Sequence, residues 1–202
     1  AEFPGVLGFG FVRRGLPDEM GVFIDAARAE GRPDFRVAQL LAHDGERFVI
    51  QYIEPLAGNA TAIGLDIASE NRRRQTALTA METGKATLTP PITLLQQGGM
   101  VPGFLLLLPV YRPGMATATP DQRRQAAIGW AYAPLMIDAV LADLARVDPD
   151  IAFGIRDMTG DADLPPFVTT AGFLTADGDV DMSPRVRRQI AVAAFGRDWV
   201  LD

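Results

Sequence analysis

The chain of 202 residues contains no cysteine and a single histidine. The lack of cysteine excludes disulfides, thiol nucleophiles and cysteine-ligated zinc sites. The lone His43 excludes a metal site with two histidine ligands and any mechanism that needs a histidine pair. His43 stands in the segment His43-Asp44-Gly45-Glu46, where we expect a solvated turn rather than a catalytic group.

Basic residues are also in short supply, since 19 Lys and Arg stand against 25 Asp and Glu, a net charge of −6. This balance offers no excess of cations to neutralise the phosphates of nucleic acid or the headgroups of an anionic membrane. Long apolar runs are absent as well. The segment Phe104–Leu108 has only five residues, whereas a membrane-spanning helix needs about 20.

Recognisable catalytic and cofactor-binding motifs are missing. The acidic turns at Asp161/Asp163 and Asp177/Asp179/Asp181 lack the spacing and the terminal glutamate of an EF-hand. The segment GFGFVRRG, residues 8–15, lacks the third glycine and the strand-to-helix setting of a dinucleotide-binding loop. We therefore expect a chain that is not an enzyme and that holds neither a cofactor nor a metal.

What the sequence does contain is a mixture of strand and helix patterns. A helix is expected over 70–83, because Gly84 follows at the position that favours a left-handed residue. The Asp44-Gly45 pair between two apolar runs predicts a β-hairpin. The other expected elements are strands at 6–12, 85–97, 103–112 and 126–134, helices at 18–31 and 135–147, and short strands between 151 and 199.

Hairpins rather than regular β-α-β alternation indicate an α+β fold with antiparallel sheets. The composition changes after Arg112, where PGMATATPDQRR is rich in Pro, Thr and Gln. We read this stretch as a division near residues 112–126. The sequence thus predicts two lobes, residues 1–115 and residues 116–202.

Several short motifs follow one another in a fixed order: Tyr52–Pro55, Gly58-Asn59, Gly64 with Asp66, Thr83-Gly84 and Pro109–Tyr111. In this order they resemble the CHASE domain, the extracellular sensing module of membrane-bound histidine kinases, nucleotide cyclases and related bacterial receptors. The resemblance is strongest over residues 45–135. It implies two PAS-like lobes, the first membrane-distal and ligand-binding and the second membrane-proximal, and a long N-terminal helix that is missing here.

The same resemblance implies a function. We expect a periplasmic or extracellular sensing domain of an inner-membrane receptor of the histidine kinase or diguanylate cyclase type. Its partners would be a small-molecule ligand, flanking transmembrane helices and a second copy in the full-length homodimer. The alternative is a structural or dimerisation module that binds nothing and relays tension between transmembrane helices.

Three arginines in the first turns of the helix at 70–83 carry the ligand hypothesis. With Ser69 as N-cap, Arg72 faces solvent, Arg73 lies on the flank of the buried face, and Arg74 lies in its middle. Arg73 matches the position of an aspartate that binds the adenine ring in plant cytokinin receptors. An arginine there favours an anionic or acceptor-rich ligand over cytokinin, while a plain ion pair with Glu70 or Asp66 remains the alternative.

Further pocket positions come from the resemblance alone. The whole set of ligand-binding candidates is Arg73, Leu95, Leu107, Thr89, Ile67, Thr61 and Arg74. Leu107 stands where the plant receptors carry a threonine, which again departs from the cytokinin pattern. For the aliphatic members, ordinary core packing is the competing interpretation, and for Arg74 it is an internal ion pair with Asp66 or Glu54.

Overall fold

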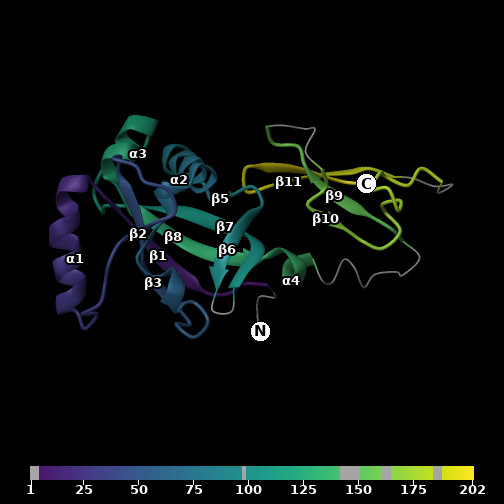
Figure 1. Ribbon diagram of the computed structural model, residues 1–202. Coiled ribbons are helices and arrows are strands. Elements are labelled where there is room, and N and C mark those ends of the chain that lie inside the picture. The colour runs from purple at the N-terminus through teal and green to yellow at the C-terminus, as the bar shows by residue number, and fades with distance from the viewer. Residues whose placement is uncertain (1–4, 97–98, 142–150, 161–164, 184–187) are drawn as a thin grey trace. The chain divides into compact units, whose positions relative to one another are not determined.

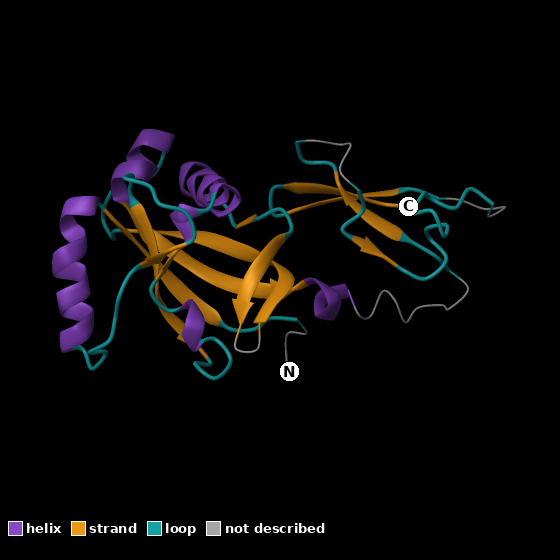
Figure 2. Cartoon of the chain, viewed as in Figure 1, coloured by secondary structure: helices purple, strands orange, loops and turns teal. Residues whose placement is uncertain are grey.

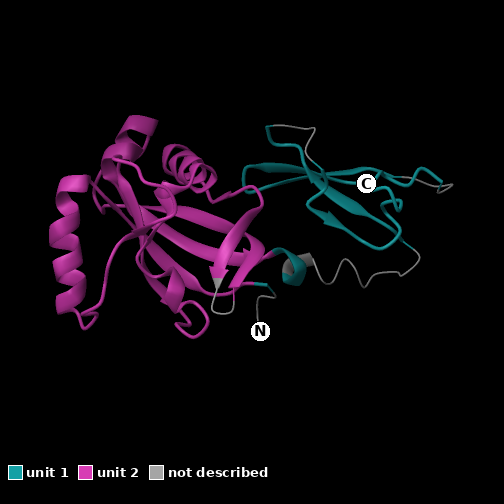
Figure 3. Cartoon of the chain, in the orientation of Figure 1, with its two compact units in different colours: residues 1–5, 137–202 teal, residues 6–136 magenta. Residues whose placement is uncertain are grey.

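The computed structural model describes residues 5–96, 99–141, 151–160, 165–183 and 188–202. The chain divides into two compact units, residues 6–136 and residues 137–202 together with 1–5 (Figure 3). Each unit has a sheet of its own, and no strand of the described residues belongs to both. The structure is of the α+β class with antiparallel sheets, as predicted.

The unit of residues 6–136 is built on an eight-stranded sheet in the order β2-β4-β3-β1-β8-β7-β5, with β6 paired to β7 (Figure 1). Its strands are β1 (Phe9–Gly15), β2 (Ala38–Gln39), β3 (Arg47–Glu54), β4 (Leu65–Asp66), β5 (Thr87–Leu88), β6 (Ile92–Gln96), β7 (Gly99–Tyr111) and β8 (Ala127–Met136). Its helices are α1 (Met20–Ala29), α2 (Asn71–Thr83) and α3 (Pro120–Ala126), with short turns η1 (Pro17–Glu19), η2 (Ala60–Ala62) and η3 (Ile67–Ser69). The few helices beside a large sheet are evident in Figure 2.

The two faces of this sheet carry separate cores. Alternate residues of a strand point to opposite faces, and β3 follows this rule: Phe48 belongs to the large core under α2, Val49 to a small core under α1. In the large core the rings of Phe48 and Trp130 lie 4.5 Å apart. The indole N–H of Trp130 donates to the carbonyl of Ala77 on α2 (2.9 Å), which ties the helix to the centre of the sheet.

The start of α2 is set by a residue next to the one expected, and its end by the residue expected. Glu70, not Ser69, is the N-cap, and its carboxylate accepts from the backbone N–H groups of Arg72 and Arg73. Ser69 instead accepts from the N–H of Leu40 (2.9 Å). At the other end Gly84 adopts φ +72°, as its position predicted.

The hairpin expected at Asp44-Gly45 is absent, so that prediction is wrong. β2 pairs in parallel with β4, and β4 lies between β2 and β3. The segment folds this way around Asp66, which is fully buried and accepts from the N–H of Phe48 and of Ala68. His43 Nε2 lies within hydrogen-bond distance of Asp66 Oδ2 (2.8 Å), so His43 is partly buried against Asp66 rather than in a solvated turn.

The predicted division near residues 112–126 also differs from the structure, in which the units separate at residues 136/137. β8 returns to the first sheet and pairs with both β1 and β7. The helix α3 directly precedes β8. It begins with a capping box of Thr119 and Gln122 and has Pro120 in its first turn. The change in composition after Arg112 marks this surface connection within one unit and not a linker between units.

The second unit holds a four-stranded antiparallel sheet in the order β10-β9-β12-β11. Its elements are α4 (Ile137–Leu141), β9 (Gly154–Asp157), β10 (Val168–Thr169), β11 (Ile190–Ala194) and β12 (Arg197–Leu201). Asp157 on β9 forms an ion pair with Arg197 on β12, which joins neighbouring strands. The rest of the helix expected at 135–147, and the turn at Asp161/Asp163, lie outside the described residues. Within those residues, no helix combines the length and the apolar character that crossing a membrane requires.

Candidate functional site

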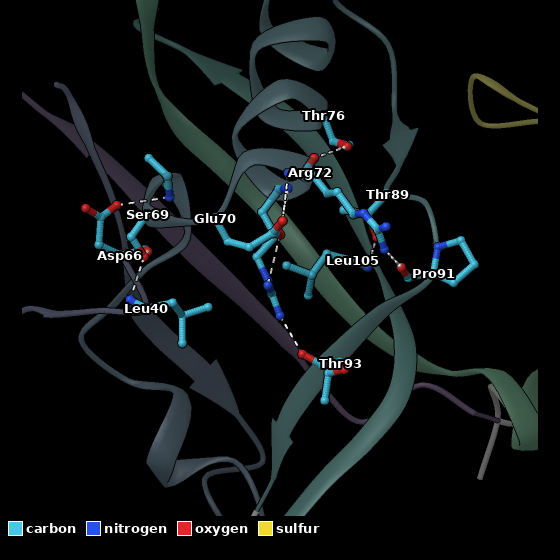
Figure 4. Close-up of polar contacts among 12 residues, drawn as sticks. Leu40, Asp66, Ser69, Glu70, Arg72, Thr76, Thr89, Pro91, Thr93 and Leu105 are labelled. Atoms are coloured by element: carbon cyan, nitrogen blue, oxygen red, sulfur yellow. Dashed lines mark hydrogen bonds and ion pairs between the residues drawn. The ribbon is translucent and has the colours of Figure 1, made fainter. Parts of the chain in front are cut away.

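Arg73 is the most deeply buried of the three arginines, with only 5% of its surface exposed. Its Nη1 donates to Glu70 Oε2 (3.0 Å), and its Nη2 donates to the carbonyl oxygen of Thr93 on β6 (2.5 Å). Figure 4 shows Glu70 at the start of the helix and Thr93 on the strand beside it. The register partner of Thr93 is Pro102, which has no backbone N–H, and the guanidinium supplies a donor at this edge.

The charge of Arg73 is balanced inside the protein. Burial lowers the pKa of its guanidinium, while the charge of Glu70 and the hydrogen bond to it act in the opposite direction. The same carboxylate caps α2 by accepting from two backbone N–H groups. The ion pair with Glu70, one of the alternatives for Arg73, is therefore present in the structure. The helix tolerates its arginines because a carboxylate occupies the positive end of the dipole.

Arg73 also lines a cavity between the N-terminal half of α2 and the sheet. The other lining residues are Ile50, Ile53, Ala62, Leu65, Ile67, Leu94, Leu95, Leu105, Tyr132 and Pro134. The walls are thus aliphatic apart from one guanidinium and one phenol. The free space inside is about 20 Å³, and a single water needs roughly 10–15 Å³ on the same measure.

Tyr132 lines this cavity, and its buried hydroxyl has no hydrogen-bond partner among the described residues. Tyr132 lies on β8 and is 4% exposed. Burial raises the pKa of its phenol well above the ordinary value of 10.0. The phenol therefore stays protonated at neutral pH, able to donate one hydrogen bond and to accept others.

Arg72 and Arg74 occupy different surroundings. Arg72 is exposed and donates from Nη1 to the carbonyl of Pro91 (3.0 Å). Arg74 is half-buried, with its guanidinium carbon 5.8 Å from the centre of the Phe48 ring. Neither residue is among those that line the cavity. The partners of Asp66 are His43 and Arg47 rather than Arg74, so the ion pair suggested for Arg74 with Asp66 is not formed.

The remaining ligand-binding candidates are divided between the cavity and its surroundings. Ile67 and Leu95 line the cavity with Arg73. Leu107 is fully buried in the core under α2, and Thr89 is fully buried with its hydroxyl oxygen accepting from the N–H of Leu105 (2.9 Å). Thr61 lies in η2 and is exposed.

The cavity includes one polar residue that the sequence did not reveal. Tyr132 stands in AIGWAYAP, a stretch that reads as an ordinary buried strand. The residue that indicates the position of the Tyr132 ring lies on the neighbouring strand. Gly10 on β1 pairs with Tyr132, and a Cβ at Gly10 would fall 2.4 Å from the ring. Only the strand register reveals that this glycine makes room for the tyrosine.

The motif residues that suggested the family lie mainly in structural contacts. The amide of Asn59 donates to the carbonyls of Leu7 (3.0 Å) and Pro55 (2.8 Å). The hydroxyl of Tyr111 donates to the carbonyl of Met81 near the end of α2 (2.7 Å). These residues hold the loops and α2 against the sheet, whereas the cavity is lined by residues that lie mostly outside the motifs.

Comparison with known proteins gives consistent results. The model of the CHASE domain family matches residues 1–167. The chain is 31% identical over 99 residues to a probable histidine kinase 6 of Oryza sativa subsp. japonica, a match that covers 47% of this chain and 10% of that protein. An extracellular ligand binding receptor from Desulfohalobium retbaense has a similar structure, with a TM-score of 0.53 and 12% identity over 98% of this chain and 29% of the other. At this identity the likeness concerns the fold alone.

Proposed function

Because the chain belongs to the CHASE domain family, whose members are extracellular sensory domains, we propose that the unit of residues 6–136 senses a small molecule in the cavity beside Arg73. In this proposal the unit is the membrane-distal lobe of a bacterial receptor anchored by flanking transmembrane helices. The unit of residues 137–202 is then the membrane-proximal lobe. The receptor is a homodimer whose output domain is a histidine kinase or a diguanylate cyclase.

The observation that supports this proposal is a charged side chain buried against an apolar cavity. A guanidinium has five N–H groups, and the recorded contacts of Arg73 take up two of them. The three others make no hydrogen bond within the described residues. Donors beside an aliphatic cavity are what a ligand with oxygen acceptors would require.

The ligand class follows from the donors. Glu70 already balances the charge of Arg73, so an acceptor oxygen is sufficient and a full negative charge is not essential. A carboxylate remains the best match, because a guanidinium binds it through two parallel charge-assisted hydrogen bonds. An N6-substituted adenine fits poorly, because its N–H groups need an acceptor and Arg73 has none to offer.

A second function has one observation in its favour. The free space of about 20 Å³ holds little more than one water, as expected of a filled core in a module that only relays movement between membrane helices. The two functions differ in whether any small molecule stabilises the domain. A ligand present at about 100 times its dissociation constant adds about 2.7 kcal/mol to the free energy of unfolding.

A thermal-shift screen against small metabolites, carboxylic acids foremost, tests the proposal. We expect a stabilising acid whose effect is lost in Arg73→Ala and kept in the exposed control Arg72→Ala. Each variant is compared with its own ligand-free melting curve, because Arg73→Ala also leaves the carbonyl of Thr93 without its donor. If both variants lost the stabilising effect of the acid equally, Arg73 would not be a specific part of the site. A screen without any stabilising compound would favour the relay module.

A further inference from the structure

The buried hydroxyl of Tyr132 is a polar group for which the fold provides no partner among the described residues. Tyr132 lines the same cavity as Arg73. A buried hydroxyl without a hydrogen bond destabilises a protein, so in an interior that serves only packing a phenylalanine would be the better residue here. The unsatisfied hydroxyl is thus a second, independent sign that this cavity receives a polar molecule.

The ring of Tyr132 is fixed by its neighbours. A Cβ at Gly10 would lie 2.4 Å from its Cε1 and 2.2 Å from the carbonyl oxygen of Tyr52, so only glycine fits at this point of β1. The ring therefore lies close against the backbone of the adjacent strand. Trp130, two residues earlier on β8, belongs to the same core under α2. These contacts restrict the movement of the ring within the core.

We propose that Tyr132 is the second polar anchor of the sensed ligand and that the ligand is a short-chain monocarboxylate, an inference that rests on the proposed function. The unused N–H groups of Arg73 and the O–H of Tyr132 are all donors. A carboxylate, which only accepts, satisfies both residues, whereas an ammonium group satisfies neither the guanidinium nor the donated hydrogen of the phenol. The aliphatic walls select a small apolar remainder over further polar groups.

The size of the ligand follows from the free space. About 20 Å³ is too little for a large metabolite, so the acid is compact and must displace some wall atoms on entry. We expect Leu94 and Leu95 of β6 to move aside, because these two long side chains line the cavity from a strand that, among the described residues, pairs with β7 alone. Acetate, propionate and pyruvate are the matching probes, and ethylamine and propionamide are the mismatched ones of similar size.

The test uses Tyr132→Phe, which removes only the hydroxyl oxygen, with Tyr52→Phe as its control. Tyr52 is exposed and its hydroxyl donates to Glu30, away from the cavity lining. We expect Tyr132→Phe without ligand to melt at the same temperature as the wild type or higher, because an unsatisfied group has been removed. We expect its dissociation constant for the tightest-binding acid, measured by calorimetry, to rise about tenfold, or about 1.4 kcal/mol. Tyr52→Phe should leave that affinity unchanged.

A second test uses NMR spectroscopy of the wild-type protein. It has only three tyrosines, so ring-labelled tyrosine yields few NMR signals, and that of Tyr132 should shift with propionate and not with ethylamine. If acids bind in an Arg73-dependent way but with equal affinity to Tyr132→Phe, the inference is overturned while the proposed function stands. A ligand-free Tyr132→Phe of lower stability would identify a structural water as the partner and overturn the inference. Failure of all three acids to bind the wild type would also overturn it.

Discussion

The cores on the two faces of the large sheet differ in size and in polarity. Under α1 the apolar core is small and is built on Ala27, Phe35 and Val49. Under α2 the core is several times larger, and the buried side chains of Arg73 and Tyr132 lie within or beside it. An apolar layer suffices to hold a helix on a sheet. The two polar side chains on the α2 face therefore lie in the part of the unit where we propose the ligand site.

The largest effect is expected from removal of the buried carboxylate of Asp66, which caps the turn η3 before α2. Asp66→Ala should lower the free energy of unfolding by about 3–5 kcal/mol, because it strips Phe48 N–H and Ala68 N–H of their acceptor and leaves His43 and Arg47 without their partner. The exposed acid Asp34 near α1 is the control, and its alanine variant should stay within about 0.5 kcal/mol. Denaturant unfolding measures both, and similar losses would contradict the contrast.

A smaller effect is expected from one aromatic residue on each face. Trp130→Phe should cost about 2 kcal/mol, because it loses ring volume and the hydrogen bond to Ala77 on α2. Phe35→Leu under α1 should cost less than about 1.5 kcal/mol, since it is a shape change in a small apolar cluster. Urea unfolding of both variants checks the order. A larger loss from Phe35→Leu would mean that the α1 face contributes more than its cluster suggests.

The glycines that follow α2 and α1 should differ in how much an alanine substitution destabilises the protein. Gly84→Ala should cost about 1–2 kcal/mol, since φ is +72° and the new Cβ would lie 3.3 Å from Arg123 Cδ. Gly31→Ala after α1 should cost about 1 kcal/mol, because φ is +93° but no atom lies within 4 Å of the new Cβ. Thermal melts of the two variants would show the difference. Equal shifts would indicate that Arg123 adjusts freely.

Tyr132 should make the free energy of unfolding depend on pH in alkaline solution, with no effect at neutral pH. Burial raises the folded-state pKa of Tyr132 above its unfolded value of 10.0, so above about pH 10 the unfolded chain releases a proton that the folded chain retains. Stability must then fall as pH rises, by up to about 1.4 kcal/mol per pH unit. Tyr132→Phe should show a shallower fall, measured by urea unfolding at several alkaline pH values. Tyr111, whose pKa is also raised, contributes equally to both proteins.

The features that the sequence predicted well are those with local causes. Gly84 ends α2 because a left-handed residue is needed there, and the strand expected at 103–112 corresponds to the second part of β7 (Gly99–Tyr111). The hairpin at Asp44-Gly45 failed because its strands are separated by β4, a partner from further along the chain. Local turn chemistry could not reveal that the segment would fold around the buried Asp66.

The candidate site was predicted in part, and the reason lies in how α2 is rotated. The sequence placed Arg74 in the middle of the buried face, which would also bury Leu78, four residues further along the helix. In the structure Leu78 is only half-buried, while Thr76 is buried with its hydroxyl donating to the carbonyl of Arg72 (2.8 Å). A threonine that satisfies its own hydroxyl in this way packs like an apolar residue. The face is therefore turned toward Arg73, which a hydrophobicity pattern alone does not indicate.

The attachments of α2 along its length have a consequence for hydrogen exchange. Side chains join the helix to other elements at its start through Arg73 and Thr93, at its middle through Ala77 and Trp130, and at its end through Met81 and Tyr111. A helix held at one end can fray from the other, whereas one held at three levels opens only when the sheet beneath it opens. We therefore expect the amides of α2 to belong to the same cooperative unit as β7 and β8, and to exchange with deuterium at the rate at which that unit opens.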